Sequence, residues 1–85
     1  MADANRLIGL GIPEPTAIEM AAQIEAQEGN ADRLKEVGVV PELATELAAQ
    51  IDAAGTTNAS KLVDLSMIPD IAVEVVAQIE GDRPE

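Results

Sequence analysis

Residues 30–52 read NADRLKEVGVVPELATELAAQID, and this stretch occurs three times in the chain. The copy 27 places earlier, residues 3–25, reads DANRLIGLGIPEPTAIEMAAQIE, and the copy 28 places later, residues 58–80, reads NASKLVDLSMIPDIAVEVVAQIE. Similarity at a fixed period indicates one supersecondary unit that packs against its own copies. The sequence therefore predicts one domain over residues 1–85, with repeats at 3–29, 30–57 and 58–81 and a frayed polar tail at 82–85.

Each repeat is predicted to begin with a short helix of about two turns. A residue with a capping side chain opens each helix, because its oxygen can accept from an unpaired first-turn amide. These residues are Asp3, Asn30 and Asn58. Each helix ends at a residue that is placed for a left-handed backbone, a conformation that suits glycine best. These residues are Gly11, Gly38 and Ser66.

A longer helix follows each turn. Proline favours the first turn of a helix, since its fixed φ fits and its missing amide costs nothing there. The prolines in question are Pro13, Pro15, Pro41 and Pro69. Glycines follow the long helices and are expected to end them; these are Gly29, Gly55 and Gly81. The long helices are therefore predicted near 15–28, 41–54 and 69–80.

The long helices carry one apolar stripe at helical spacing. In the second repeat its members are Leu43, Ala44, Leu47, Ala48 and Ile51, and the other repeats place similar residues at the same positions. The predicted fold is all-α: three tandem helix-turn-helix repeats of about 27 to 28 residues. The repeats could form one small bundle or stack as a short solenoid.

The composition excludes most catalytic chemistry. The 85 residues include no cysteine, histidine, tryptophan, tyrosine or phenylalanine, so thiolate and imidazole nucleophiles and the usual zinc and haem ligands are absent. Ser60 and Ser66 have no histidine base in the chain, and no run of acids has the spacing of a calcium loop. We predict a protein that is not an enzyme, with no catalytic, cofactor-binding or metal-binding residues.

The charge argues against nucleic acid as a partner. Sixteen acids and five bases give a formal net charge of −11, which repels a phosphate backbone. Leu10-Gly11-Ile12-Pro13 is similar to the helix-hairpin-helix DNA-binding turn, but that turn's second glycine is replaced and acids begin the following helix. The apolar run before Pro13 is too short to span a bilayer, so a membrane is not expected as a partner either.

A repeated pair of polar residues borders each apolar stripe. The pairs lie at i and i+4 and are Glu19/Gln23, Glu46/Gln50 and Glu74/Gln78. Two interpretations stay open. The glutamines could sit at a half-exposed boundary or bond between the units of the chain. Alternatively, all six residues could form the polar rim of a surface that contacts another protein, in which case replacing the glutamines should leave folding nearly intact.

The segment Arg6-Leu7-x-x-Leu10-Gly11-Ile12-Pro13, followed by Ala-x-Gln-Ile, and the segment 33–51, which ends in Ala-x-Gln-Ile, resemble a helical segment of tailed-bacteriophage virion structural proteins. The resemblance implies a non-catalytic capsid decoration or minor capsid component. Such a component would bind capsid or other virion proteins, or further copies of itself in a multi-copy assembly, in a virion assembled in the host cytoplasm. The alternative is a free acidic adaptor or inhibitor that binds a basic surface of a host or phage protein. High salt would weaken that alternative interaction steeply.

Overall fold

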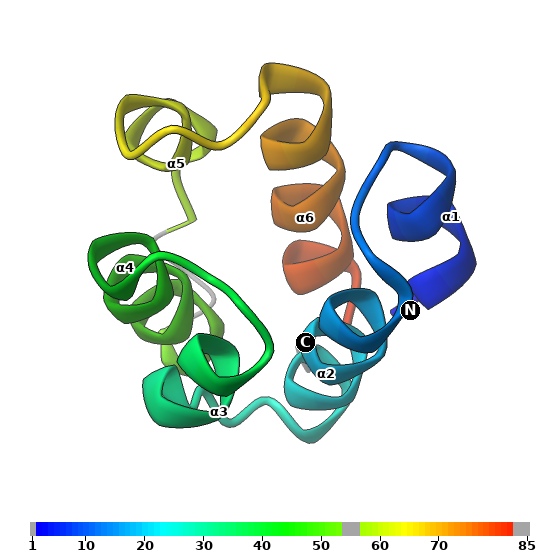
Figure 1. The fold of residues 1–85 in the computed structure, drawn as a ribbon, viewed down its shortest axis with the longest axis horizontal. Helices are drawn as coiled ribbons and strands as arrows, with labels where there is room; N and C mark the ends of the chain where they lie inside the picture. Colours follow the sequence, from blue (N-terminus) through cyan, green and yellow to red (C-terminus); the bar gives the residue numbers. More distant parts are fainter. Residues whose placement is uncertain (1, 54–56, 83–85) are drawn as a thin grey trace.

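In the computed structural model, which describes residues 2–53 and 57–82, each repeat forms a short helix joined by a tight turn to a long helix (Figure 1). The helices are α1 (Ala4–Gly9), α2 (Glu14–Ala26), α3 (Ala31–Glu36), α4 (Pro41–Asp52), α5 (Ala59–Asp64) and α6 (Pro69–Asp82). The hairpins are α1 with α2, α3 with α4 and α5 with α6. The predicted all-α architecture of three helix-turn-helix repeats is confirmed.

The predicted caps and turns of the short helices are also confirmed. Each capping side chain accepts a hydrogen bond from the backbone amide three residues on, at 3.2–3.3 Å. The residues after the short helices have positive φ: 109° at Gly11, 101° at Gly38 and 88° at Ser66. In each turn the next amide reaches back across the helix end, as Val39 N–H does to the Leu34 carbonyl at 3.0 Å.

The long helices end at Ala26, Asp52 and Asp82, each within two residues of its predicted end, and local geometry explains the differences. Helix α2 ends at Ala26, because Gln27 adopts the left-handed conformation (φ 57°) and the Glu28 amide closes the last turn on the Gln23 carbonyl at 3.1 Å. Helix α6 continues through Gly81 to Asp82, so the predicted tail overlaps this helix by one residue. A glycine in a last helical turn costs only about 1 kcal/mol, which continued helix can offset. Gly55 and residues 83–85 lie outside the described ranges.

Gly29 was predicted to end the first long helix. It instead allows a close contact between two segments of backbone. A β-carbon at this position would lie 2.1 Å from the Ala48 carbonyl oxygen and 2.7 Å from the Ala48 carbonyl carbon. The Gly29 amide also donates to the Asp52 side chain at 2.6 Å. The missing side chain therefore lets the connection between the first two repeats run directly against the backbone of α4.

The three hairpins close into a ring. Helix α2 contacts α3 and α4 contacts α5, as neighbours along the chain, and α6 contacts α1 across the whole length of the sequence. Figure 1 shows α1 beside α6, at the opposite end of the chain. Each long helix thus meets the short helix of the next repeat, and the third repeat meets the first. The repeats therefore form one closed bundle with a pseudo-threefold arrangement, and a linear solenoid was the wrong alternative.

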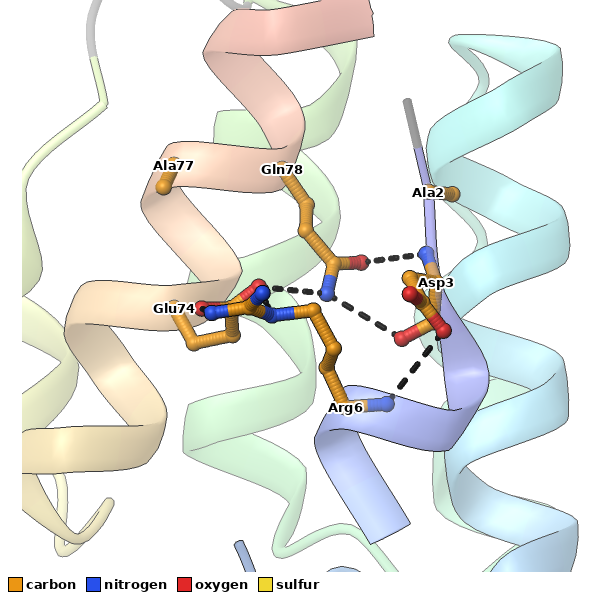
Figure 2. A pocket seen from close by; sticks show the side chains of 6 residues that line it. All are labelled: Ala2, Asp3, Arg6, Glu74, Ala77 and Gln78. Carbon is orange, nitrogen blue, oxygen red and sulfur yellow. Dashed lines mark hydrogen bonds and ion pairs between the residues drawn. The ribbon is translucent and has the colours of Figure 1, made fainter. Parts of the chain in front are cut away.

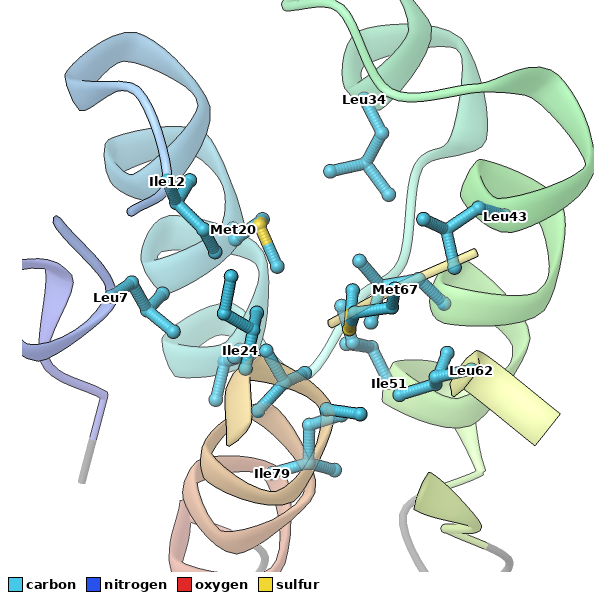
Figure 3. Close-up of a cluster of buried hydrophobic side chains, with 14 of the residues drawn as sticks. Leu7, Ile12, Met20, Ile24, Leu34, Leu43, Ile51, Leu62, Met67 and Ile79 are labelled. Atoms are coloured by element: carbon cyan, nitrogen blue, oxygen red, sulfur yellow. The ribbon is translucent and has the colours of Figure 1, made fainter. Parts of the chain in front are cut away.

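The apolar stripes of the three long helices meet inside this ring. One cluster of buried side chains includes residues from all six helices of the described ranges (Figure 3). Leu47 and Val75 are fully buried, and so is the leucine that each short helix contributes. These leucines are Leu7, Leu34 and Leu62. The stripe predicted from spacing is therefore the core, and burial of this aliphatic surface is the main favourable term for folding.

Candidate functional site

The three glutamines lie at the joints where one repeat meets the next. In the joint between α6 and α1, the Gln78 side chain accepts from the Asp3 amide at 3.0 Å and donates to the Asp3 carbonyl at 3.1 Å (Figure 2). The same Gln78 nitrogen donates to Glu74 at 2.9 Å. Gln23 makes the equivalent three bonds at 2.9–3.1 Å, and Gln50 at 2.8–3.1 Å. Each amide therefore pairs with both backbone groups of the residue that caps the next short helix.

The three glutamates pair with cations on the same short helices. Glu19 accepts two hydrogen bonds from the Arg33 guanidinium, at 3.1 and 3.2 Å. Glu74 accepts two from Arg6 at 3.1 and 3.3 Å, and these side chains meet in Figure 2. In the remaining joint Lys61 Nζ lies 3.8 Å from Glu46. The same polar set, with lysine in place of arginine once, therefore occurs at all three joints.

The structure places the six predicted partner-contact residues in pairs at the joints. There they contact the next repeat of the same chain. The glutamines are only 2–5% exposed and the glutamate side chains 14–22% exposed. Bonding between units, one of the interpretations left open from sequence, describes the glutamines. Contact with a separate protein stays a prediction, and in this conformation it would reach only the glutamates.

The joint between α2 and α3 also has an electrostatic signature. Hydrogen bonds from Arg33 and then from Gln23 favour the ionised carboxylate, and they hold the pKa of Glu19 below its ordinary value of 4.5. The hydrogen bond to Glu19 in turn raises the pKa of Arg33, which stays charged at every usable pH. Only the glutamate of this pair titrates in a range where folding can be measured.

We therefore expect this joint to weaken in acid. The unfolded chain binds a proton at Glu19 near the ordinary pKa, and the folded chain only at lower pH, so the stabilisation is present above about pH 4.5 and is lost as the pH falls through the folded pKa. Helical circular dichroism should show Glu19→Gln melting below the parent protein at neutral pH. That difference should shrink as the pH falls towards about 3. A difference that is independent of pH would contradict this account.

A second feature lies where the three turns meet, and no candidate from sequence pointed to it. The turns and the first residues of the long helices line an apolar hollow of about 340 Å³. Its deeper lining includes Met20, Leu47 and Met67, which are buried, while Val40 and Ile68 are 53% and 58% exposed. Pro13 is the corresponding residue of the first repeat. The available sequence signal was an apolar residue just before each long helix, outside the stripe.

The hollow is lined mainly by apolar side chains. Thr16, one of its hydroxyl-bearing residues, donates to the Val37 carbonyl at 2.7 Å, and most of the other lining residues are aliphatic. Among the described residues, no group of three or more acids has the arrangement that could hold a metal ion. None of the described helices combines the length and the apolar character needed to cross a membrane. The hollow can therefore bury apolar groups, but it presents no activated nucleophile or paired acid and base.

Comparison of the chain with protein-family models, with curated proteins and with solved structures finds no match.

Proposed function

We propose that this protein is a non-catalytic docking module that holds another protein through the apolar hollow. The observation that carries the proposal is the exposure of Val40 and Ile68 beside a depression lined by all three repeats. Large aliphatic side chains on a water-facing surface cost little singly, but a rimmed apolar depression is typical of a protein contact site. The joints supply the rigidity, because each is fixed by backbone-directed amide bonds.

The setting that we propose is the virion of a tailed bacteriophage, with this chain as a capsid decoration or minor capsid component. The support is the resemblance of the repeated segment to such structural proteins, together with the exposed apolar hollow that the three repeats form. Weak individual contacts suit a component present in many copies, because effective concentration multiplies their strength.

The second candidate is a free adaptor or inhibitor that binds a basic surface. The net charge of −11 favours it, since acidic proteins associate rapidly with basic partners. The two candidates differ in where the protein is found: the first predicts a protein that sediments with virus particles, and the second predicts a protein that does not.

Replacing Val40 and Ile68 with serine should reduce incorporation into particles by about tenfold, since each removes apolar contact area. The double variant should keep its helical circular dichroism, because exposed positions contribute little to folding. The measurement is the amount of protein that sediments with purified virus particles from the source of the gene.

The matched control is Ile18→Ser with Val73→Ser. These residues are 54% and 62% exposed, lie on long helices and do not line the hollow. The control variant should be incorporated like the parent protein. Unchanged incorporation of the Val40 and Ile68 variant would show that the protein does not dock through the hollow. Absence of the parent protein from the purified particles would contradict the proposal that it is a virion component.

A further inference from the structure

We propose that the occupant of the hollow is an amphipathic helical segment of another protein, with lysine or arginine beside its apolar face. This inference rests on the proposed docking function and adds the chemistry of the partner. Three features of the hollow carry it: its shape, the charges beside it and the lack of a free sheet edge.

The shape suits a cluster of side chains. All three repeats line the hollow, so it is a depression between turns and not a long groove, and its volume of about 340 Å³ has room for a few aliphatic side chains. An amphipathic helix presents such a cluster, because its residues at i, i+3 and i+4 lie on one face. An extended segment would need a sheet edge for its backbone, and the described residues form helices and turns without a strand.

Each long helix begins with an exposed carboxylate that does not itself line the hollow but is adjacent in sequence to a residue that does. Glu14, Glu42 and Asp70 lie in the first turns of the three long helices, next to lining residues in the sequence. Among the described residues, no lysine or arginine is ion-paired with any of these three. A helix N-terminus carries about half a positive charge, so a full carboxylate there leaves each helix start net negative.

The cations of the described chain are engaged elsewhere. Arg6, Arg33 and Lys61 pair with the joint glutamates, and Lys35 pairs with Asp32 at 3.3 Å. None of the lysines and arginines in the described ranges lines the hollow. An occupant with basic residues beside its apolar face would therefore meet complementary charge, whereas a second copy of this chain, with a charge of −11, would be repelled.

The test uses synthetic helical peptides with one leucine face. One peptide carries lysines beside that face, a second carries glutamines, a third carries glutamates, and a fourth has the composition of the first in scrambled order. A fluorophore on the peptide reports binding by anisotropy, and amide spectra of the ¹⁵N-labelled protein locate the site. We expect the lysine peptide to bind about tenfold more tightly than the glutamine peptide at low salt, and the glutamate and scrambled peptides to bind more weakly still.

Variants separate the apolar contribution from the charged one. Val40→Ser with Ile68→Ser should weaken binding of the lysine peptide by about tenfold at every salt concentration. Glu42→Gln with Asp70→Asn should weaken it at low salt and flatten the salt dependence. The matched control is Glu25→Gln with Glu28→Gln, which removes the same charge near the other end of α2 and should leave binding nearly unchanged.

The expected spectra show shifts at the amides of the three turns, residues 11–12, 38–40 and 66–68, since Pro13 has no amide proton. Equal binding of the lysine and glutamine peptides would overturn the basic character of the occupant while leaving docking at the hollow intact. Tight binding of the scrambled peptide, shifts confined to other surfaces, or no binding by any peptide would overturn the inference as a whole. The proposed function fails separately, through unchanged incorporation of the Val40 and Ile68 variant.

Discussion

Replacing Gln23, Gln50 and Gln78 together with alanine is expected to remove most or all of the folding stability. Each amide satisfies a backbone N–H and a backbone C=O of the next capping residue. These hydrogen bonds are part-buried, and a buried polar group left without a partner costs about 1–3 kcal/mol, so the three joints together cost at most about 3–9 kcal/mol. A chain of 85 residues has a total stability of about 4–13 kcal/mol.

Urea unfolding measures this effect. It is followed by circular dichroism at 222 nm, because a chain without aromatic residues has no intrinsic fluorescence to follow. Gln50→Ala alone should lower the free energy of unfolding by about 1–3 kcal/mol, and the control Glu42→Ala, at an exposed position on the same helix, by less than about 0.5 kcal/mol. A triple variant as stable as the parent would show that water replaces the amides at no cost. The expectation from sequence, that folding would survive, applied to an exposed rim and not to buried joints.

Gly29→Ala should be the most damaging change of a single atom. The new β-carbon would lie 2.1 Å from the Ala48 carbonyl oxygen, far inside van der Waals contact, and the obstacle is backbone that cannot rotate away. Helix α4 and the connection before α3 would have to separate, which strains the Gln23 bonds to Asn30 as well. We expect a loss of at least about 2 kcal/mol in urea unfolding.

Gly9→Ala is the matched control. No atom lies within 4 Å of a β-carbon built there, and the residue ends α1 without a positive φ. Alanine should therefore be neutral there, or stabilising by about 0.5–1 kcal/mol, because it restricts the unfolded chain. If Gly29→Ala and Gly9→Ala have equal effects, the close approach to α4 does not constrain the fold.

Local chemistry explains why much of this fold could be predicted. The capping role of Asn30 and the left-handed turn at Gly38 depend on residues a few positions apart, and both recur in register in every repeat. The buried stripe was predictable for the same reason, since helical spacing alone places Leu43 and Leu47 on one face. Repetition strengthened each assignment, because three independent segments had to agree.

What could not be predicted depends on contacts between repeats. Gln50 has the same neighbours along its helix whether it faces water or the next cap, so sequence left both interpretations open. Gly29 looked like a helix terminator because the approach of Ala48 is a tertiary event. The hollow could not be predicted for a related reason. Val40 and Ile68 are far apart in sequence, and they share a surface only when the three repeats close into a ring.

The contact between α6 and α1 forms without a short chain connection between the two helices. It has the same amide pairing and the same arginine-to-glutamate pair as the joint between α2 and α3, yet no short stretch of chain connects its two sides. Covalent linkage is therefore not what sets the geometry of a joint. The contacts between a long helix and the next short helix are therefore enough to hold a joint closed, whether or not the chain passes directly from one to the other.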